Sequence, residues 1–144
     1  MPILAGQTVT ETMLNRLQSK TYSAAGSGTL AGAVTNADVP SATITLTTET
    51  AGAEYEAECV WDFDATVAGP GNSSARMALD GTPLTPLATF GGNDTAERST
   101  VAQSYHGTIP TAGIHTFKLL ASPVAGHQVQ GVNSFIKVTI KEVV

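Results

Sequence analysis

The chain has 144 residues, of which 42% are hydrophobic and 13% charged, and its formal net charge is -5. This length suits one folded domain, and the composition lacks the high charge that marks a disordered chain. Seven Lys and Arg residues are spread singly and form no basic stripe, so we expect no nucleic-acid partner. No segment approaches about 18 consecutive apolar residues and the start lacks a basic, apolar leader, so we expect neither a membrane span nor a signal peptide.

The first predicted element is a short amphipathic helix at residues 9–18. Thr8 and Glu11 have the spacing of a capping box. A helix of about ten residues is marginal on its own, so its apolar stripe must pack on its own domain, a sister subunit or a docking partner. We therefore interpret residues 1–20 as an anchoring arm and residues 21–144 as the body. The predicted anchoring residues are Val9, Met13, Leu14 and Leu17.

From about residue 21 the pattern is that of strands separated by short turns rich in Gly and Pro. The sequence predicts seven or eight strands and no second helix, which is typical of an all-β fold, a single antiparallel β-sandwich or jelly roll. The clearest strand segments are residues 42–49, 52–66, 74–80, 97–109, 114–122 and 133–143.

The segment "EYEAECVWDFDAT", residues 54–66, alternates strictly between two faces. One face is apolar: Tyr55, Ala57, Cys59, Trp61, Phe63 and Ala65. The other carries Glu54, Glu56, Glu58, Val60, Asp62 and Asp64. Catalytic carboxylates flank a cleft and require one raised pKa, whereas a flat row supplies neither. We interpret the acidic side as a solvated or subunit-contact face, balanced by Lys118, Lys137 or Arg76. The lone cysteine, Cys59, excludes an intrachain disulfide and is expected to be buried.

Two segments, residues 66–75 and 90–97, are rich in Gly, Asn and Ser and are expected to be exposed loops suited to binding. Their candidate exposed residues are Asn72, Ser73, Asn93 and Asp94. Alternation places Tyr55, Trp61, Phe63 and Phe117 inside. That leaves Phe90, Tyr105 and Phe135 as candidates for the exposed aromatic platform that a carbohydrate-binding module would need.

The histidines give no support for catalysis or metal binding. His106 and His115 would approach each other if residues 97–109 and 114–122 paired as a hairpin, and His127 stands apart. No metal-ligand spacing, nucleophile elbow, phosphate loop or dinucleotide fingerprint is present. We expect a protein that is not an enzyme and that has no cofactor.

Four segments resemble a family of small virion proteins of tailed phages that infect actinobacteria. They are "PILAGQTVTETMLNRLQ", "VPSATITLTTETAGAEYEAECVWDFDA", "LDGTPLTPLATF" and "AGIHTFKLLASP". The resemblance covers nearly the whole chain, and the strands are similar to trimeric jelly rolls of the complement and tumour-necrosis-factor type. It carries no catalytic residues.

This resemblance implies a homotrimeric structural protein on the virion, made in the host cytoplasm. We expect a capsid decoration protein whose partners are its own copies and the major capsid protein. The alternatives are a minor tail or tail-fibre protein that binds tail proteins and contributes to host attachment, or a carbohydrate-binding module that recognises a host surface glycan. Neither nucleic acid nor membrane is an expected partner.

Overall fold

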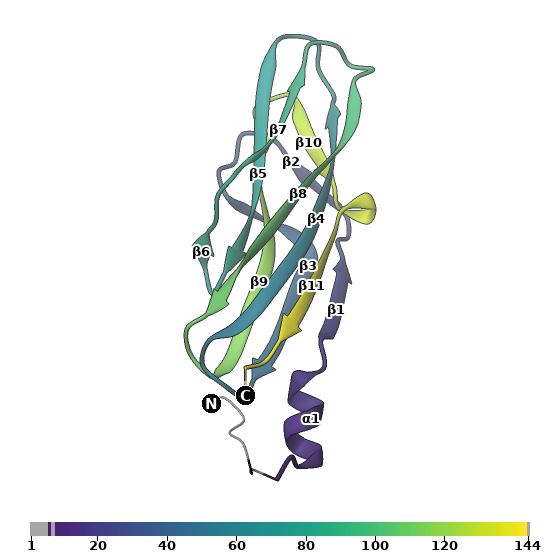
Figure 1. The fold of residues 1–144 in the computed structure, drawn as a ribbon. Coiled ribbons are helices and arrows are strands. Elements are labelled where there is room, and N and C mark those ends of the chain that lie inside the picture. The colour runs from purple at the N-terminus through teal and green to yellow at the C-terminus, as the bar shows by residue number, and fades with distance from the viewer. Residues whose placement is uncertain (1–5, 7, 144) are drawn as a thin grey trace.

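A computed structural model describes Gly6 and residues 8–143. Part of the predicted anchoring arm, residues 1–5 and 7, lies outside the described residues. Within them the chain forms one α-helix, a 3-10 helix and eleven strands (Figure 1). The helices are α1 (Glu11–Leu17) and η1 (Gly131–Asn133). The strands are β1 (Lys20–Ala25), β2 (Thr29–Ala31), β3 (Ala37–Thr48), β4 (Ala53–Ala65), β5 (Gly71–Leu79), β6 (Thr82–Pro83), β7 (Ala88–Gly92), β8 (Arg98–Ile109), β9 (Gly113–Ser122), β10 (His127–Gln130) and β11 (Phe135–Lys141).

The strands form two antiparallel sheets that pack face to face, which confirms the predicted all-β jelly-roll-like sandwich. In the first sheet β4 is central: β8 pairs along one of its edges, and β11 and then β10 pair along the other. β1 and β2 lie outside β11 and β10. In the second sheet the order is β3, β9, β5, and β5 then pairs with both β6 and β7.

The core lies between the sheets and is built from the inward side chains of alternating strands. Trp61, Phe63 and Phe117 are fully buried, as the alternation predicts. The ring of Phe63 stacks on that of Phe90 from β7, with 5.4 Å between centroids. Cys59 is buried as expected, and burial raises the pKa of its thiol to about 12.

The sequence predicts the long strands well, whereas the short strands β6, β7 and β10 fall outside the predicted strand segments. β7 and the start of β5 lie in segments predicted as exposed loops, and β6 and β10 lie between the clearest predicted strand segments. The hairpin that would bring His106 close to His115 does not form, because β8 pairs with β4 while β9 pairs with β3 and β5 in the other sheet. The short segment between them crosses from one sheet to the other.

The helix α1 exists but begins later than the capping box predicted. Its N-cap is Thr10, with extended backbone, and the Thr10 side chain accepts a hydrogen bond from the Met13 amide at 3.3 Å. Thr8 therefore lies outside the helix. No helix of the described residues has the length and apolar character that a membrane crossing would require.

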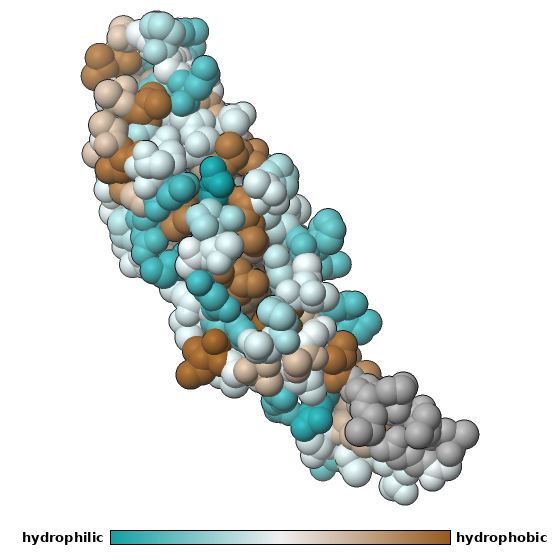
Figure 2. All heavy atoms as spheres, turned by 90° about the vertical axis from the view of Figure 1, so that its left-hand side faces the viewer, coloured by the Kyte–Doolittle hydropathy of each residue, from teal (hydrophilic) through white to brown (hydrophobic). Residues whose placement is uncertain are grey.

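Figure 2 views the side of the sandwich that lies on the left in Figure 1, where β6 and the edge of β8 lie. Apolar residues, in brown, are visible there as a broken strip between polar residues. Apolar side chains are therefore exposed along this side of the sandwich.

Candidate functional site

The outward face of β4 carries the predicted acidic row. Glu54, Glu56 and Glu58 are all exposed, as predicted. Across the ladder to β11 they lie opposite Lys141, Thr139 and Lys137, and across the ladder to β8 opposite Thr108, His106 and Ser104. We call these nine residues the acidic face. Its cations sit on the neighbouring strand, so the face presents mixed charge rather than a purely acidic surface.

One ion pair on the acidic face was predicted correctly. The Lys137 ammonium donates to the Glu58 carboxylate at 2.8 Å, and both side chains are more than 40% exposed. An exposed pair of this kind contributes at most about 1 kcal/mol to the free energy of unfolding. Lys118, the second predicted partner, instead binds Asp38 on the other sheet at 2.6 Å. Arg76 also lies on that other sheet, in β5.

Two open hollows lie on the acidic face, one around Glu54 and His106 and one around Glu58 and Lys137. The carboxylates that line both hollows are exposed. No group of three His, Cys, Asp or Glu side chains is gathered for a metal ion anywhere in the described residues.

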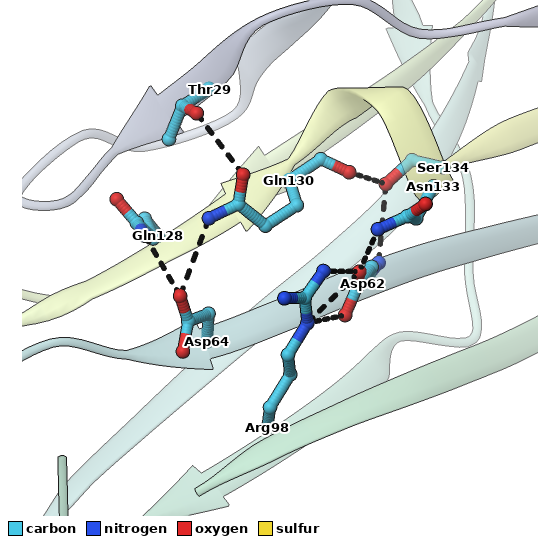
Figure 3. A network of polar contacts seen from close by, with 8 residues as sticks. All are labelled: Thr29, Asp62, Asp64, Arg98, Gln128, Gln130, Asn133 and Ser134. Atoms are coloured by element: carbon cyan, nitrogen blue, oxygen red, sulfur yellow. Dashed lines mark hydrogen bonds and ion pairs between the residues drawn. The ribbon is translucent and has the colours of Figure 1, made fainter. Parts of the chain in front are cut away.

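Asp62 was predicted on this hydrated face, and that prediction is wrong. Its side chain is only 4% exposed, because Arg98 from β8 lies across it (Figure 3). The Arg98 Nε donates to both carboxylate oxygens, at 2.9 and 3.2 Å, and Arg98 Nη2 donates as well. Asn133 adds a hydrogen bond of 2.7 Å. The hydrogen bond from Arg98 lowers the pKa of Asp62, further helped by Asn133, against the opposing effect of burial.

The neighbouring Asp64 continues the same polar network (Figure 3). Its Oδ2 accepts hydrogen bonds from the side-chain amides of Gln128 at 2.8 Å and Gln130 at 3.3 Å. Gln130 in turn accepts from the Thr29 hydroxyl at 3.2 Å. The network links β2, β10, η1, β4 and β8, so its hydrogen bonds stabilise the packing of these five elements in the first sheet.

An apolar row crosses the same face next to these polar groups. Successive ladders place Ala25, Phe135, Val60 and Ala102 side by side on β1, β11, β4 and β8. We call these four residues the apolar rung. Phe135 is 40% exposed, and Val132 in the adjoining η1 is 64% exposed. Phe135 is therefore exposed as predicted, whereas the other two aromatic candidates, Phe90 and Tyr105, are buried in the core and those predictions are wrong.

The predicted anchoring residues lie on or beside α1 at one end of the molecule. No residue of α1 is buried, and Val9, Leu14 and Leu17 are 44%, 53% and 43% exposed. Met13 is partly buried. The helix is connected to the body by an exposed ion pair in which the Arg16 Nε donates to Glu49 at 2.7 Å.

The predicted loop residues lie at the opposite end of the molecule from α1 (Figure 1). Asn72, Asn93 and Asp94 are exposed, as predicted. The amide of Gly69 donates to the carbonyl of Asn93 at 2.9 Å, which brings the two loops together. Ser73 is the exception: it is buried, because it occupies an inward position of β5.

The Ser73 hydroxyl contacts His127 Nδ1 at 2.7 Å and accepts a hydrogen bond from the Val124 amide at 3.1 Å. The other two histidines have different surroundings. His115 contacts Asp80 at 2.7 Å and the Thr111 carbonyl at 3.0 Å, and His106 is exposed on the acidic face. The three histidines therefore lie in three different environments and do not form one site.

Sequence reasoning missed the partners of Asp62, namely Arg98 and Asn133. The sequence did contain one indication that Arg98 pairs with a carboxylate. Arg98 is the only Lys or Arg in the predicted strand at residues 97–109, and an acidic residue on a neighbouring strand is a favourable partner for it. Asn133 lies in η1, which no sequence pattern predicted.

No family model matches the chain, and no curated protein matches its sequence. Among solved structures, the chain is similar to dimeric latent PorU from Porphyromonas gingivalis, with a TM-score of 0.54 and 10% identity. That match covers 86% of this chain and 13% of PorU, so this chain spans a small part of that protein.

Two further solved structures have lower TM-scores. The globular domain of zebrafish complement 1qA protein has a TM-score of 0.41 and 11% identity over 86% of this chain and 97% of that one. The Gt strain of infectious bursal disease virus gives 0.42 and 15% identity over 88% and 38%. The likeness to PorU indicates a shared fold alone, and TM-scores below 0.5 support no conclusion about this chain.

Proposed function

We propose that the protein is a non-enzymatic structural protein of a phage virion, a trimeric capsid decoration protein that attaches to the particle surface through residues 1–20. The observation that carries this proposal is the exposure of the apolar side chains of α1. These side chains lie outside a sandwich whose core is already complete without them.

The helix has features of a docking element rather than of a core element. Seven residues are too few for a stable isolated helix in water, and a tertiary contact usually supplies the missing stability. Burying Leu14 and Leu17 against a partner would contribute roughly 1.5 to 3 kcal/mol for each side chain. The major capsid protein is the partner we propose.

The body is suited to display. α1 and the end of β11 lie at one end of the elongated sandwich, and the paired loops with Asn72, Asn93 and Asp94 lie at the other (Figure 1). A protein attached by α1 therefore directs these polar loops away from the particle. The apolar rung on the first sheet supplies a side surface for contact between the copies of a trimer.

The test is binding of the purified protein to particles that lack it. We expect the double variant Leu14→Ser, Leu17→Ser to lose binding while its thermal midpoint stays within about 2 °C of the parent, because surface changes rarely move stability by more than about 0.5 kcal/mol. The matched control is Val67→Ser, which changes a 59% exposed apolar residue in the loop that follows β4. It should bind like the parent.

Retained binding by the double variant would overturn the proposed attachment. A large fall in its thermal midpoint would show instead that α1 belongs to the core of the body. Imaging the labelled protein on intact particles shows whether it is bound to the head or to the tail. Label found on the tail alone would favour the alternative function, a minor tail protein.

A further inference from the structure

The outer edge of the long strand β8 pairs with no other strand among the described residues, although β7 of the other sheet lies near β8. It is paired with β4 over twelve residues, from Ala53 opposite Ile109 to Asp64 opposite Arg98, without a shift of register. Strand edges that remain exposed are usually shortened, bulged or interrupted by proline, because their unpaired amides and carbonyls accept further strands. The edge strands β2, β3, β6 and β7 show such devices, whereas β8 shows none of them.

The contrast with β3 is clear. β3 is also twelve residues long, but its edge contains Pro40, a left-handed Ser41 with φ of 64° and a shift of register between Asp38 and Thr43. The edge strands β2, β6 and β7 have three, two and five residues. β8 contains neither proline nor bulge.

The ladder identifies which groups of β8 point outward. The Ala65 amide donates to the Glu97 carbonyl at 2.9 Å, and the Gly52 amide donates to the Ile109 carbonyl at 2.7 Å. Antiparallel ladders alternate, so the odd-numbered residues of β8 bond to β4 and the even-numbered ones direct their amides and carbonyls to the outer edge. These are Thr100, Ala102, Ser104, His106 and Thr108, all of them exposed.

The hydrogen bonds of the described residues agree with this assignment. The Ser104 carbonyl accepts from the side chain of Gln103 at 3.1 Å, a local donor in place of a neighbouring strand. Apart from the pairing with β4, no hydrogen bond from backbone to backbone between described residues involves positions 100–108.

We propose that the outer edge of β8 binds the same edge of a second copy, antiparallel and with Ser104 on the two-fold axis. This register places Ala102 opposite His106 of the partner subunit and Thr100 opposite the partner's Thr108. The side chains are small or uncharged, and no like charges meet. Cross-strand threonine pairs already occur within this fold, with Thr21 and Thr139 hydroxyls 3.1 Å apart.

Electrostatic repulsion between the two copies does not prevent this contact. The acidic residues nearest the edge are Glu54, Glu56 and Glu58 on β4, one strand away. In the pair, the two rows would be three strand spacings apart, about 14 Å at roughly 4.8 Å each. That exceeds the Debye length of about 8 Å at physiological salt, so their repulsion is largely screened.

The proposed contact between two β8 strands is expected to be weak because it buries little surface. It is confined to one pair of strands, and interfaces that bury less than about 1,200 Å² in total are typically transient. It would therefore form where copies are concentrated, and it could join one trimer to another on a particle. The pairing itself does not depend on the proposed function, and purified protein suffices to test it.

Disulfide trapping tests both the contact and its register. Residues paired across an antiparallel ladder have Cα atoms about 5.5 Å apart, within disulfide range. Under mild oxidation we expect Ser104→Cys to form a covalent dimer. The matched control is Ala102→Cys, whose two copies would be offset by four residues, about 13 Å along the strands. It should cross-link at least about ten times more slowly, because its sulfurs cannot meet.

A mixture of Ala102→Cys with His106→Cys should cross-link to each other, because the proposed register makes these positions opposite. The native Cys59 is buried and does not compete. Equal rates for Ser104→Cys and Ala102→Cys would overturn the proposal, as would the absence of any dimer of Ser104→Cys at millimolar protein. Because covalent dimers of purified protein are scored on denaturing gels, the outcome does not depend on whether the protein binds particles.

Discussion

At the scale of single residues, Asp62 offers the most direct test of the structure. The hydrogen bond from Arg98 lowers the pKa of Asp62, so its carboxylate stabilises the fold above the ordinary Asp pKa of about 3.9. That contribution is lost as the pH falls through the lower pKa of the folded state. We expect Asp62→Asn to lower the free energy of unfolding at pH 7 by about 1.5 to 3 kcal/mol, the range for hydrogen bonds to charged groups.

Urea unfolding at several pH values measures this effect. The difference between parent and Asp62→Asn should be full at neutral pH and should shrink below about pH 4. Glu56→Gln, an exposed position on the same strand, is the control and should change stability by less than about 0.5 kcal/mol. An Asp62→Asn variant as stable as the parent at pH 7 would contradict the Arg98 pairing.

Residue-level prediction from the sequence succeeded where alternation alone decides burial. Trp61 and Phe63 are inside and Glu54 is outside because a regular strand points successive side chains to opposite faces. It failed at Asp62, because Arg98 from another strand covers that side chain. It failed at Ser73 because its segment reads as a loop, and a loop has no alternation from which an inward position can be inferred.

At the scale of elements, the turn between β3 and β4 is held by a residue just beyond β11. The buried carboxylate of Glu142 accepts hydrogen bonds from the amides of Glu49 and Thr50, at 2.9 and 3.1 Å, and from the Thr50 hydroxyl at 2.7 Å. Burial acts to raise the pKa of Glu142, but the hydrogen bonds from Thr50 and from the Glu49 amide outweigh it and lower the pKa.

We expect Glu142→Gln to destabilise the fold by about 1 to 3 kcal/mol, because an amide group replaces one acceptor oxygen with a donor that faces other donors. Hydrogen exchange at the amides of Glu49 and Thr50 should accelerate, as a local readout of the turn. Glu54→Gln, which lies on the exposed acidic face, should leave both measurements unchanged. Unaltered protection of the two amides in Glu142→Gln would show that this carboxylate does not hold the turn.

Element prediction depended on length. β3, β4, β8, β9 and β11 are long enough for their period to be visible, whereas β6, β7 and β10 are too short and too rich in Gly, Pro or polar residues. The connection between β8 and β9 shows a second limit. A short Pro- and Gly-containing segment fits a hairpin and a crossing between sheets equally well, and the pairing of both strands with other partners decides it.

At the scale of the whole molecule, three surfaces point in different directions. The exposed apolar side of α1 is at one end, the paired loops are at the other, and the acidic face with its apolar rung runs along the side. The sequence predicted the arm and the exposed loops as separate regions. It could not predict that Ala25, Phe135, Val60 and Ala102 form one row, because that row depends on the order of four strands in the sheet.

The apolar rung leads to a prediction about assembly. Phe135 is 40% exposed in the isolated chain, with Val60 beside it, and burial of such a side chain contributes roughly 1.5 to 3 kcal/mol. Closed symmetry lets one such patch serve every subunit. We therefore expect the copies to associate, and the proposed function predicts a trimer of three 14.8 kDa chains, about 44 kDa by light scattering.

The variant Phe135→Ser should be a folded monomer, because it removes the largest apolar side chain of the rung without entering the core. Ile114→Ser is the matched control: Ile114 is 73% exposed but lies on β9 in the other sheet, so this variant should remain a trimer. Circular dichroism confirms that each variant is folded before its mass is compared. A parent protein that stays monomeric at high concentration, or a Phe135→Ser variant that stays trimeric, would show that the rung does not hold the copies together.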